Sequence, residues 1–323
     1  MPTKQEIIKD TIRQFSQFPT RSIARYLLEM YGGLFDYDIE KIRGRIRYYR
    51  GQSGESHRQE VKEIIESDII PLPETWNRPE EPYVLPEGKW LVISDAHIPF
   101  HSKKAIEAAI EYGIQENCTG VFMNGDMQDC QAVSYWPSMI RRNFMGEVSI
   151  FIDFLDHLRQ KFPTAKIVYK PGNHEYRLPR FYAKQQPDLI GSPVAAMESL
   201  LDFESRDIEF LDYFQMVMAG KLPILHGHEI RQISRAVNPA RGLALKAKTW
   251  AACSHFHTTS EHTGTNLLGA YLTTWSFGCL CDLKPEYCKY GNDWNHGFAT
   301  IDIDKKGGFG VRNLRIMPSG EVR

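Results

Sequence analysis

The stretch Lys166–Glu175, which reads KIVYKPGNHE, decides the fold that the sequence predicts. Its first part, Lys166–Tyr169, is a largely apolar run typical of a buried strand, and Pro171-Gly172 ends that run in a tight loop. Open α/β folds place their ligands in loops at the carboxyl ends of their strands. Asn173 and His174 stand side by side in this loop, so we expect both to take part in chemistry.

Further strands that end in polar loops lie before and after this stretch. The predicted strands are residues 90–93, 120–123, 221–225 and 250–253, and the predicted helices between or beside them are 103–112, 144–162 and 240–248. Short apolar runs between turn residues predict more strands within residues 267–316. Strands that alternate with helices predict an α/β fold with its functional site along one edge of a sheet.

Length and composition are those of a soluble globular protein. The 323 residues allow one large and one small domain, and the net charge of −1 means that any basic surface must be local. The apolar runs are too short for a membrane span, so we expect no membrane partner. Residues 1–10 lack the apolar core of a secretion signal, which predicts a cytoplasmic protein.

The six cysteines form no Cys-x-x-Cys pair. Cys279, Cys281 and Cys288 lie close together in the sequence and could in principle hold a metal, but their spacing matches no common zinc pattern. Reduced, partly buried thiols are the better interpretation.

Residues 1–70 predict a small all-α domain. The first helix spans 5–15, and Thr20 is expected to cap a second helix that ends at Gly32-Gly33. Asp36 or Asp38 is expected to cap a third helix, which continues to residue 50. This third helix carries five cations, which are Lys41, Arg43, Arg45, Arg47 and Arg50.

A helix, a short glycine-containing turn and a basic helix together give the outline of a helix-turn-helix module. The cations predict contacts with the phosphates of nucleic acid, with DNA as the expected partner. The alternative is a helical docking domain with a solvated cationic face, and Gly44 inside the third helix favours that alternative. Five prolines within residues 71–86 predict a linker or strap over 71–88, and the second domain is expected to span 89–323.

Polar residues at the predicted strand ends form a set of metal-ligand types. The set consists of Asp95, His97, Asp126, Asn173, His174, His226, His255 and His257. Oxygen and imidazole ligands without thiolate suit Mn, Fe, Zn, Ni or Cu better than Ca. Seven such ligands suffice for two metal ions, which in a two-metal site clamp the attacking and leaving oxygens of a phosphoryl displacement.

The order of these motifs along residues 89–260 resembles that of the calcineurin-like metallophosphoesterase superfamily. The motifs are Asp-x-His (95–97), Gly-Asp-x-x-Asp (125–129), Gly-Asn-His-Glu (172–175), His226 and His-x-His (255–257). The resemblance implies a four-layer α/β/β/α sandwich that follows the helix-turn-helix-like domain. It also implies two divalent metal ions, for which Mn²⁺ is expected and Fe, Zn or Ni are the alternatives.

The resemblance also implies a role for each matched residue. One metal would be held by Asp95, His97 and His257, the other by Asn173, His226 and His255, and both by a bridging Asp126. His228 is a weaker candidate for the place of His226. A metal-activated hydroxide would attack phosphorus, and His174, oriented by Asp129, would protonate the leaving oxygen. Arg177 is expected either to bind a substrate phosphate or to form a surface ion pair.

Two positions depart from the superfamily pattern. Ser254 replaces the glycine of the usual Gly-His-x-His motif, which leaves both imidazoles in place. Cys130 stands where the Ser/Thr protein phosphatases of the superfamily carry Arg, so protein phosphatase activity is not expected. Tyr176 and Arg177, together with the helical N-terminal domain, are more similar to phosphoesterases of phage and mobile elements.

The sequence therefore predicts a phosphodiesterase or nuclease that acts on DNA or another nucleic acid. The first alternative is a phosphoesterase for nucleotides or cyclic nucleotides whose N-terminal helices serve assembly. The second alternative is a DNA-binding or adaptor protein with a vestigial phosphoesterase domain, and the retention of every ligand position in residues 95–257 argues against it.

Overall fold

The computed structural model describes residues 2–52, 81–136, 138–139, 143–192, 195–230, 238–286 and 290–323. The chain divides into two compact units, Met1–Arg78 and Pro79–Arg323. Residues 53–70 of the predicted all-α domain, residues 71–80 of the predicted linker, and Cys288 all lie outside the described residues. None of the described helices is long and apolar enough to cross a membrane.

Within the described residues 2–52, the first unit has three α-helices, α1 (Lys4–Gln14), α2 (Thr20–Tyr31) and α3 (Ile39–Tyr49). Their apolar faces meet in one small core, which includes Ile8, Ile12, Ile23, Leu27, Ile42 and Ile46. Of the two predicted caps for α3, the Asp38 carboxylate accepts the backbone N–H groups of Glu40 and Lys41. The predicted cap at Thr20 is wrong, because Pro19 precedes the helix and Thr20 is already its first helical residue.

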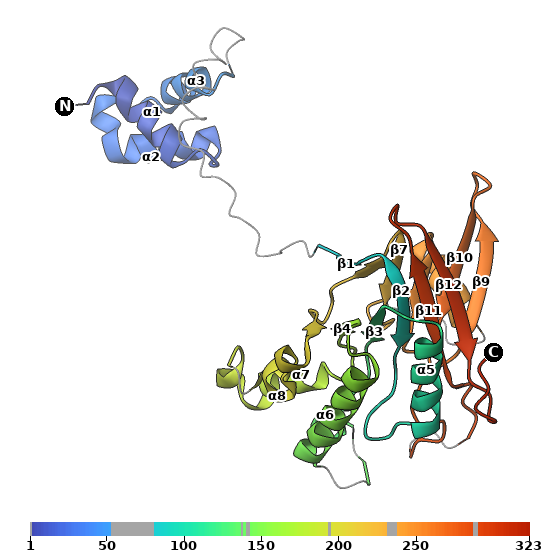
Figure 1. The fold of residues 1–323 in the computed structure, drawn as a ribbon. Helices are drawn as coiled ribbons and strands as arrows, with labels where there is room; N and C mark the ends of the chain where they lie inside the picture. The colour runs from blue at the N-terminus through green and yellow to red at the C-terminus, as the bar shows by residue number, and fades with distance from the viewer. Residues whose placement is uncertain are drawn as a thin grey trace. The chain divides into compact units, whose positions relative to one another are not determined.

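The second unit is built on two six-stranded sheets (Figure 1). The first sheet has the order β12-β11-β2-β3-β4-β5. Strands β2 to β5 run parallel to one another, and β11 runs antiparallel to both of its neighbours, β2 and β12. Its strands are β2 (Gly88–Ile93), β3 (Gly120–Asn124), β4 (Lys166–Lys170), β5 (Ile208–Phe210), β11 (Gly297–Ile303) and β12 (Phe309–Arg315). The predicted strands 90–93, 120–123 and 166–169 are thus its neighbouring parallel strands.

The second sheet has the order β1-β6-β7-β8-β10-β9. Its strands are β1 (Tyr83–Leu85), β6 (Val217–Ala219), β7 (Leu222–Leu225), β8 (Ala251–Cys253), β9 (Ser260–Thr265) and β10 (Tyr271–Ser276). Within the segment 71–88 that was predicted as a linker or strap, β1 pairs with β6 at the edge of this sheet, and β2 begins at Gly88.

Alternate residues of the central strands pack on opposite faces of the first sheet. Trp90, Val92, Phe122 and Val168 face a core that they share with the second sheet, where Ile224 and Ala252 lie. Leu91, Ile93, Val121 and Ile167 face the core on the other side, beneath α5 (Lys103–Gln115) and α6 (Phe144–Lys161). Burial on both faces explains why these strands are continuous apolar runs instead of alternating ones.

The outer face of the second sheet is covered by α9 (Pro239–Ala247), whose Leu243 packs against Ala251 and Cys253 of β8. The layers are therefore helices, sheet, sheet and helix. This confirms the predicted four-layer α/β/β/α sandwich, and Figure 1 shows α5 and α6 beside the first sheet.

Candidate metal centre

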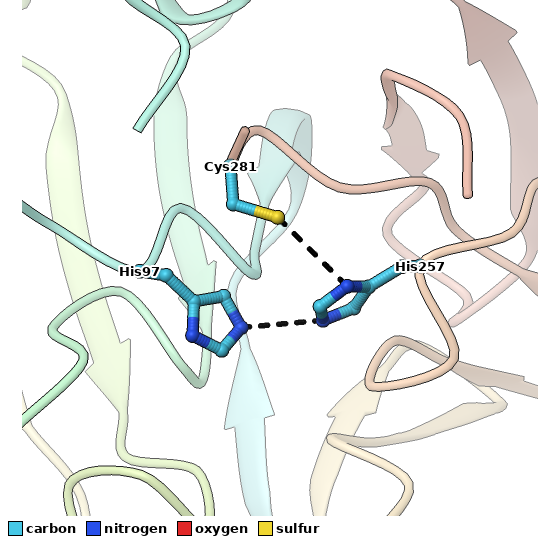
Figure 2. A group of neighbouring side chains, drawn as sticks. All are labelled: His97, His257 and Cys281. Atoms are coloured by element: carbon cyan, nitrogen blue, oxygen red, sulfur yellow. Dashed lines mark hydrogen bonds between the residues drawn. The ribbon is translucent and has the colours of Figure 1, made fainter. Parts of the chain in front are cut away.

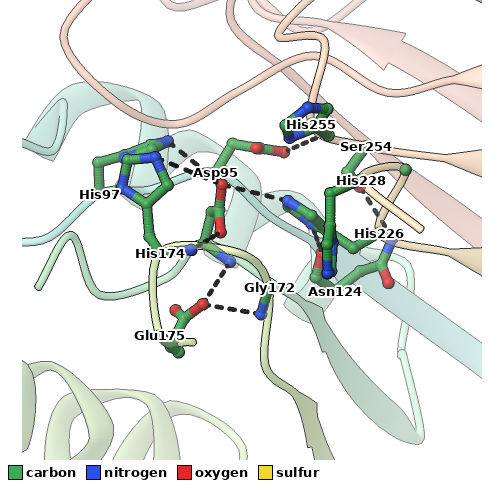
Figure 3. Close-up of polar contacts among 12 residues, drawn as sticks. Asp95, His97, Asn124, Gly172, His174, Glu175, His226, His228, Ser254 and His255 are labelled. Atoms are coloured by element: carbon green, nitrogen blue, oxygen red, sulfur yellow. Dashed lines mark hydrogen bonds and ion pairs between the residues drawn. The ribbon is translucent and has the colours of Figure 1, made fainter. Parts of the chain in front are cut away.

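The predicted ligands lie in loops that follow five strands of the two sheets. Asp95 and His97 follow β2, Asp126 follows β3 and Asn173 follows β4, all from the first sheet. His226 follows β7, and His255 and His257 follow β8, both strands of the second sheet. Figure 3 shows side chains of these loops pointing toward one another across the gap between the sheets' ends.

Most of these ligand positions have an unusual backbone conformation. Positive φ angles of 49–70° occur at Asp95, His97, Asp126, His255 and His257. For residues other than glycine this region costs about 1 kcal/mol or more, and such strain gathers at functional sites. Five of the candidate ligands therefore have a strained backbone conformation.

Two glycines leave space for the side chains of candidate ligands. A side chain on Gly172 would collide with the Asp126 carboxylate, and one on Gly125 would collide with the His226 ring. Gly125 also has a φ of +83°, which glycine adopts without strain. These contacts give a physical reason for the glycines that precede Asp126 and Asn173.

A first group of ligand atoms is centred on His257. Its Nε2 atom stands 3.2 Å from Asp95 Oδ1 and 3.2 Å from His97 Nε2. His97 Nε2 in turn lies 4.0 Å from Asp126 Oδ2. The three residues predicted for the first metal are therefore together, with Asp126 at their edge.

A second group of ligand atoms lies on the other side of Asp126. His226 Nε2 stands 3.1 Å from Asp126 Oδ2, and one ring nitrogen of His255 lies within 4.8 Å of both ligand atoms. His226 is fully buried, and its Nδ1 is held 2.7 Å from the Asn124 carbonyl, so its Nε2 faces the centre. Asp126 thus lies between the two groups, where a bridging ligand must be.

Three buried polar atoms in these groups have no hydrogen-bond partner. They are Asp95 Oδ1, Asn173 Oδ1 and His226 Nε2. Asp95 Oδ1 and His226 Nε2 have ion-pair contacts with His257 and Asp126 at 3.2 and 3.1 Å, and a cation at this place would give all three atoms a ligand bond. Oxygen and imidazole donors of this kind fit divalent cations, so the residues present match a two-metal centre.

The charges of the site are mutually compensating. Burial by itself would lower the pKa values of His226 and His257, but Asp126 and Asp95 respectively raise each to about 10. Burial and the neighbouring His226 lower the pKa of His255 to about 3. Despite its burial, Asp126 has a pKa well below the usual range because of His226 and His174. Without cations, imidazolium groups must balance these carboxylates.

The predicted catalytic pair is also assembled. His174 Nδ1 lies 2.9 Å from Asp129 Oδ1, and the same oxygen lies 2.8 Å from His97 Nδ1. Asp129 therefore fixes two rings at once, and His174 Nε2 is turned toward the centre, 3.8 Å from Asp126 Oδ2. The carboxylate is nearly buried, yet the two histidines hold its pKa well below the usual range.

Arg177 begins α7 (Arg177–Gln185) beside this pair. Its Nη1 donates to the Asp129 carbonyl at 2.9 Å and lies 3.4 Å from Asp129 Oδ2, and its Nη2 is 3.0 Å from His174 Nε2. The ion pair lies within the cleft instead of on the surface, and contact with a substrate phosphate stays a prediction for this residue.

The structure favours His226 over His228 as the ligand. His228 Nδ1 lies 3.4 Å from Glu229 Oε2, and no described ligand group includes it. Glu229 also accepts the backbone N–H of Gly227 at 2.7 Å and pairs with the buried Lys170. The Lys170–Glu229 pair therefore fixes the turn that presents His226.

Sequence reasoning missed the part that Glu175 plays. This buried carboxylate accepts backbone N–H groups from Asp126, Gln128 and Gly172 at 2.7–3.0 Å, and the Tyr169 hydroxyl at 2.6 Å. It thereby ties the loop after β3 to the loop after β4 (Figure 3). The only sequence signal was its place as the last residue of the Gly-Asn-His-Glu motif.

The role of Asn124 was missed as well. Its side-chain Nδ2 donates to the Leu225 carbonyl and to Ser254 Oγ, both at 2.9 Å, which links loops from the two sheets. Ser254, which replaces the usual glycine, therefore has a bonding partner and leaves His255 and His257 in place.

Cys281 lies beside His257, and Figure 2 shows it on the same side of that ring as His97. Its sulfur is 3.8 Å from His257 Nδ1, and the sulfur, one ring nitrogen of His97 and one of His257 all lie within 4.8 Å of one another. Metal-binding histidines commonly hold a carboxylate or carbonyl at this second nitrogen. The five cysteines that the structure describes are free and buried, as expected, but this placement was not predicted.

The centre opens into a cleft of about 1170 Å³. Its walls include His97, Asp126, Asp129, Asn173, His174, Arg177, His255 and His257. Four aromatic side chains, Phe100, Trp136, Phe256 and Trp294, also line it. The acidic side chains Asp282, Glu286 and Asp293 lie among the described residues at its mouth.

The five cations of α3 lie in the first unit and have different surroundings. Lys41, Arg45 and Arg47 are exposed. Arg43 pairs with Glu40 at 2.5 Å, and Arg50 donates to the carbonyls of Phe15 and Ser16. Lys41 Nζ also lies 3.4 Å from Asp38 Oδ2, and Arg50 joins the end of α3 to the end of α1.

No protein-family model matches the chain. It is 27% identical over 228 residues to the Gene 54 protein of Mycobacterium phage L5 and 26% identical over 227 residues to that of phage D29. Each match covers 66% of this chain and 88% of the phage protein. The chain is therefore similar to proteins of mycobacteriophages.

Solved structures of a phosphoesterase, of Vps29 and of a dimetal phosphatase are among the matches. The phosphoesterase YfcE from E. coli is 14% identical to this chain and has a TM-score of 0.34. The match covers 70% of this chain and 98% of the YfcE chain. Vps29 from Chaetomium thermophilum is 13% identical and has a TM-score of 0.36, and the match covers 73% of this chain and 94% of the Vps29 chain. A dimetal phosphatase from Danio rerio is 11% identical and has a TM-score of 0.33, and the match covers 68% of this chain and 94% of the phosphatase chain.

Proposed function

We propose that this chain is a two-metal phosphoesterase that hydrolyses phosphodiester bonds of nucleic acid or nucleotides. The observation that carries this proposal is the position of Asp126 between the two groups of candidate ligands, with its Oδ2 4.0 Å from His97 Nε2 and 3.1 Å from His226 Nε2. The order of the motifs from Asp95 to His257 supports it through the superfamily resemblance. Mn²⁺ is the proposed metal, with Fe, Zn or Ni as alternatives.

Two divalent cations bound here would polarise the phosphoryl oxygens and lower the pKa of a water molecule between them. Asp95, His97 and His257 would hold one ion, Asn173, His226 and His255 the other, and Asp126 both. This assignment of all seven ligands remains part of the proposal.

His174 is the proposed general acid. Its Nδ1–H donates to Asp129, which orients the ring and favours the imidazolium form, whereas burial brings the pKa of His174 below its ordinary value. Arg177, 3.0 Å from the same Nε2, would neutralise a substrate phosphate oxygen there. Since neither residue belongs to the proposed ligand set, their loss should spare the metals.

The substrate class is inferred from the N-terminal unit and the relatives. The exposed Lys41, Arg45 and Arg47 of α3 suit phosphates, so we propose that residues 1–70 form a helix-turn-helix-like unit that binds DNA. The similarity to mycobacteriophage proteins supports a phage-type enzyme. Cys130 is fully buried where a protein phosphatase carries Arg, which speaks against phosphoprotein substrates.

One observation favours the alternative in which the N-terminal helices serve assembly. Arg43 and Arg50 already have protein partners, which reduces the number of cations free for phosphate. In that case the same active site would act on a free nucleotide, and the first unit would not affect its turnover.

The test is Mn²⁺-dependent hydrolysis of end-labelled single- and double-stranded DNA and of an aryl phosphodiester by the full chain. We expect hydrolysis that His174→Ala reduces by about 10²–10⁴-fold, the usual contribution of a general acid, while elemental analysis shows the metals retained. Unchanged turnover in His174→Ala would contradict the acid role. A wild-type protein that takes up no metal and hydrolyses none of these substrates would overturn the proposed function.

A further inference from the structure

Four aromatic side chains from four separate segments meet in the cleft. Phe100 follows β2, Trp136 follows the 3₁₀ turn Gln131–Val133, Phe256 follows β8, and Trp294 precedes β11. Trp136 is 71% exposed, and Phe256 and Trp294 are half-buried, in contrast to the fully buried core rings Trp90 and Phe122. All four rings therefore contribute aromatic surface to the wall of the cleft.

Two of these rings lie directly against the proposed metal ligands. The Trp294 ring is 4.1 Å from the His257 ring between centroids, and the Phe256 ring is 5.2 Å from that of His255. A phosphate held at the metal centre therefore has its esterified groups within reach of flat aromatic faces. Stacking on such faces is the common way in which proteins hold an unpaired nucleobase.

The cleft also has a suitable size. Its volume of about 1170 Å³ slightly exceeds the roughly 300–1,000 Å³ of ordinary small-molecule pockets, which leaves room for a nucleotide and part of a neighbour. A base inside a duplex is already stacked and paired, so it cannot cover these rings until it has been freed.

We propose that Trp294 and Phe256 form a stacking wall for an unpaired nucleobase next to the hydrolysed phosphate. This inference rests on the proposed phosphoesterase function and names its substrate class as a free nucleotide ester or a single-stranded nucleic acid. Phe100 and Trp136 extend the wall toward the mouth of the cleft.

The test compares two esters that share a leaving group and differ only in the base. Thymidine 5′-(p-nitrophenyl) phosphate carries a nucleobase, whereas methyl p-nitrophenyl phosphate does not. The ratio of their kcat/KM values measures the contribution of the base. We expect the wild-type protein to prefer the nucleoside ester, and Trp294→Ala and Phe256→Ala each to reduce the ratio by about 5- to 100-fold, as base–aromatic stacking implies.

Two controls separate stacking from support of the histidine rings. Trp294→Phe keeps a ring and should restore most of the preference, and Tyr271→Ala removes an exposed aromatic of β10 that does not line the cleft and should leave the ratio unchanged. If Trp294 and Phe256 only supported His257 and His255, both esters would be slowed equally and the ratio would stay constant.

Each outcome has a distinct meaning. A wild-type protein without preference for the nucleoside ester, or a constant ratio in both alanine variants, overturns the stacking wall and leaves the phosphoesterase standing. Faster hydrolysis of a duplex than of the same strand unpaired also overturns it. Failure of the wild-type protein to hydrolyse either ester overturns the proposed function, and the inference falls with it.

Discussion

At the scale of single residues, Asp126 connects everything in the centre. Its Oδ2 lies 3.1 Å from His226, 3.8 Å from His174 and 4.0 Å from His97, and its Oδ1 accepts the backbone N–H of His174 at 2.8 Å. One carboxylate thus faces ligands from both sheets and the proposed acid. Replacement of this carboxylate should therefore affect metal binding by both groups of ligands.

Asp126→Asn should lower the occupancy of both metals. The amide keeps the shape and can still accept the His174 N–H, but it loses the negative charge that two cations share, so we expect affinity to fall by at least about 10-fold. Elemental analysis after equilibrium dialysis measures this. Asp153→Asn, on the exposed side of α6, is the matched control. Two ions retained at wild-type affinity would contradict the bridging role.

Cys281 offers a finer test of the first group. With Nε2 of His257 turned to the centre, Nδ1–H donates to the sulfur at 3.8 Å and fixes the ring. Cys281→Ala should therefore weaken metal binding by roughly 10-fold, in the range of such outer partners. Cys281→Ser keeps an acceptor and should lose less. Competition with a chelator measures both, with Cys118→Ala as the control. Equal affinity in wild type and Cys281→Ala would exclude the positioning role.

At the scale of elements, the predicted strands and helices followed from burial. Runs such as 90–93 and 120–123 are apolar throughout because both faces pack, and each ends where polar loop residues begin. The three-residue strands β1, β5 and β6 are too short to show any period in the sequence. The cap of α2 was misplaced because threonine suits a cap, whereas Pro19 occupies that position here.

Helix α6 carries a carboxyl group whose titration should be visible in stability. Glu147 is buried near the start of the helix, where its Oε1 accepts the Ala132 N–H at 2.9 Å and its Oε2 has no hydrogen-bond partner. Burial raises its pKa to about 7, above the ordinary value of 4.5. The folded protein therefore holds this proton more tightly than the unfolded chain does.

The sign of the pH dependence follows from that difference. Since the folded pKa is the higher one, the contribution of Glu147 to stability is fully present below about pH 4.5 and is lost as the pH rises to about 7. Between pH 5 and 8 the free energy of unfolding should fall, relative to Glu147→Gln, by on the order of 1–2 kcal/mol after allowance for solvent screening. Urea denaturation at both pH values measures it. A difference that stays constant would contradict a raised pKa.

At the scale of the whole second unit, the site exists only where two sheets meet. Asp95, His97, Asp126 and Asn173 come from the first sheet, and His226, His255 and His257 come from the second. The sequence order of the motifs was enough to predict the set. The residues that hold it together, such as Glu175 and Asn124, could not be predicted, because they join segments far apart in the chain, such as Gln128 to Glu175 and Asn124 to Leu225, which are 47 and 101 residues apart.

The N-terminal unit supplies the remaining prediction for the whole molecule. Because Arg43 and Arg50 are half-buried, the exposed Lys41, Arg45 and Arg47 are the cations to replace together by alanine in the full chain. If these side chains bind phosphates, affinity for duplex DNA should fall, and the slope of log K against log[salt] should flatten by about 0.9 for each phosphate that is no longer neutralised. A titration at several salt concentrations measures both quantities. Replacement of the exposed Lys103, Lys184 and Lys246 of the second unit is the charge-matched control. Equal affinity and slope in the two triple variants would assign these helices to assembly, because a change in net charge alone acts on both alike.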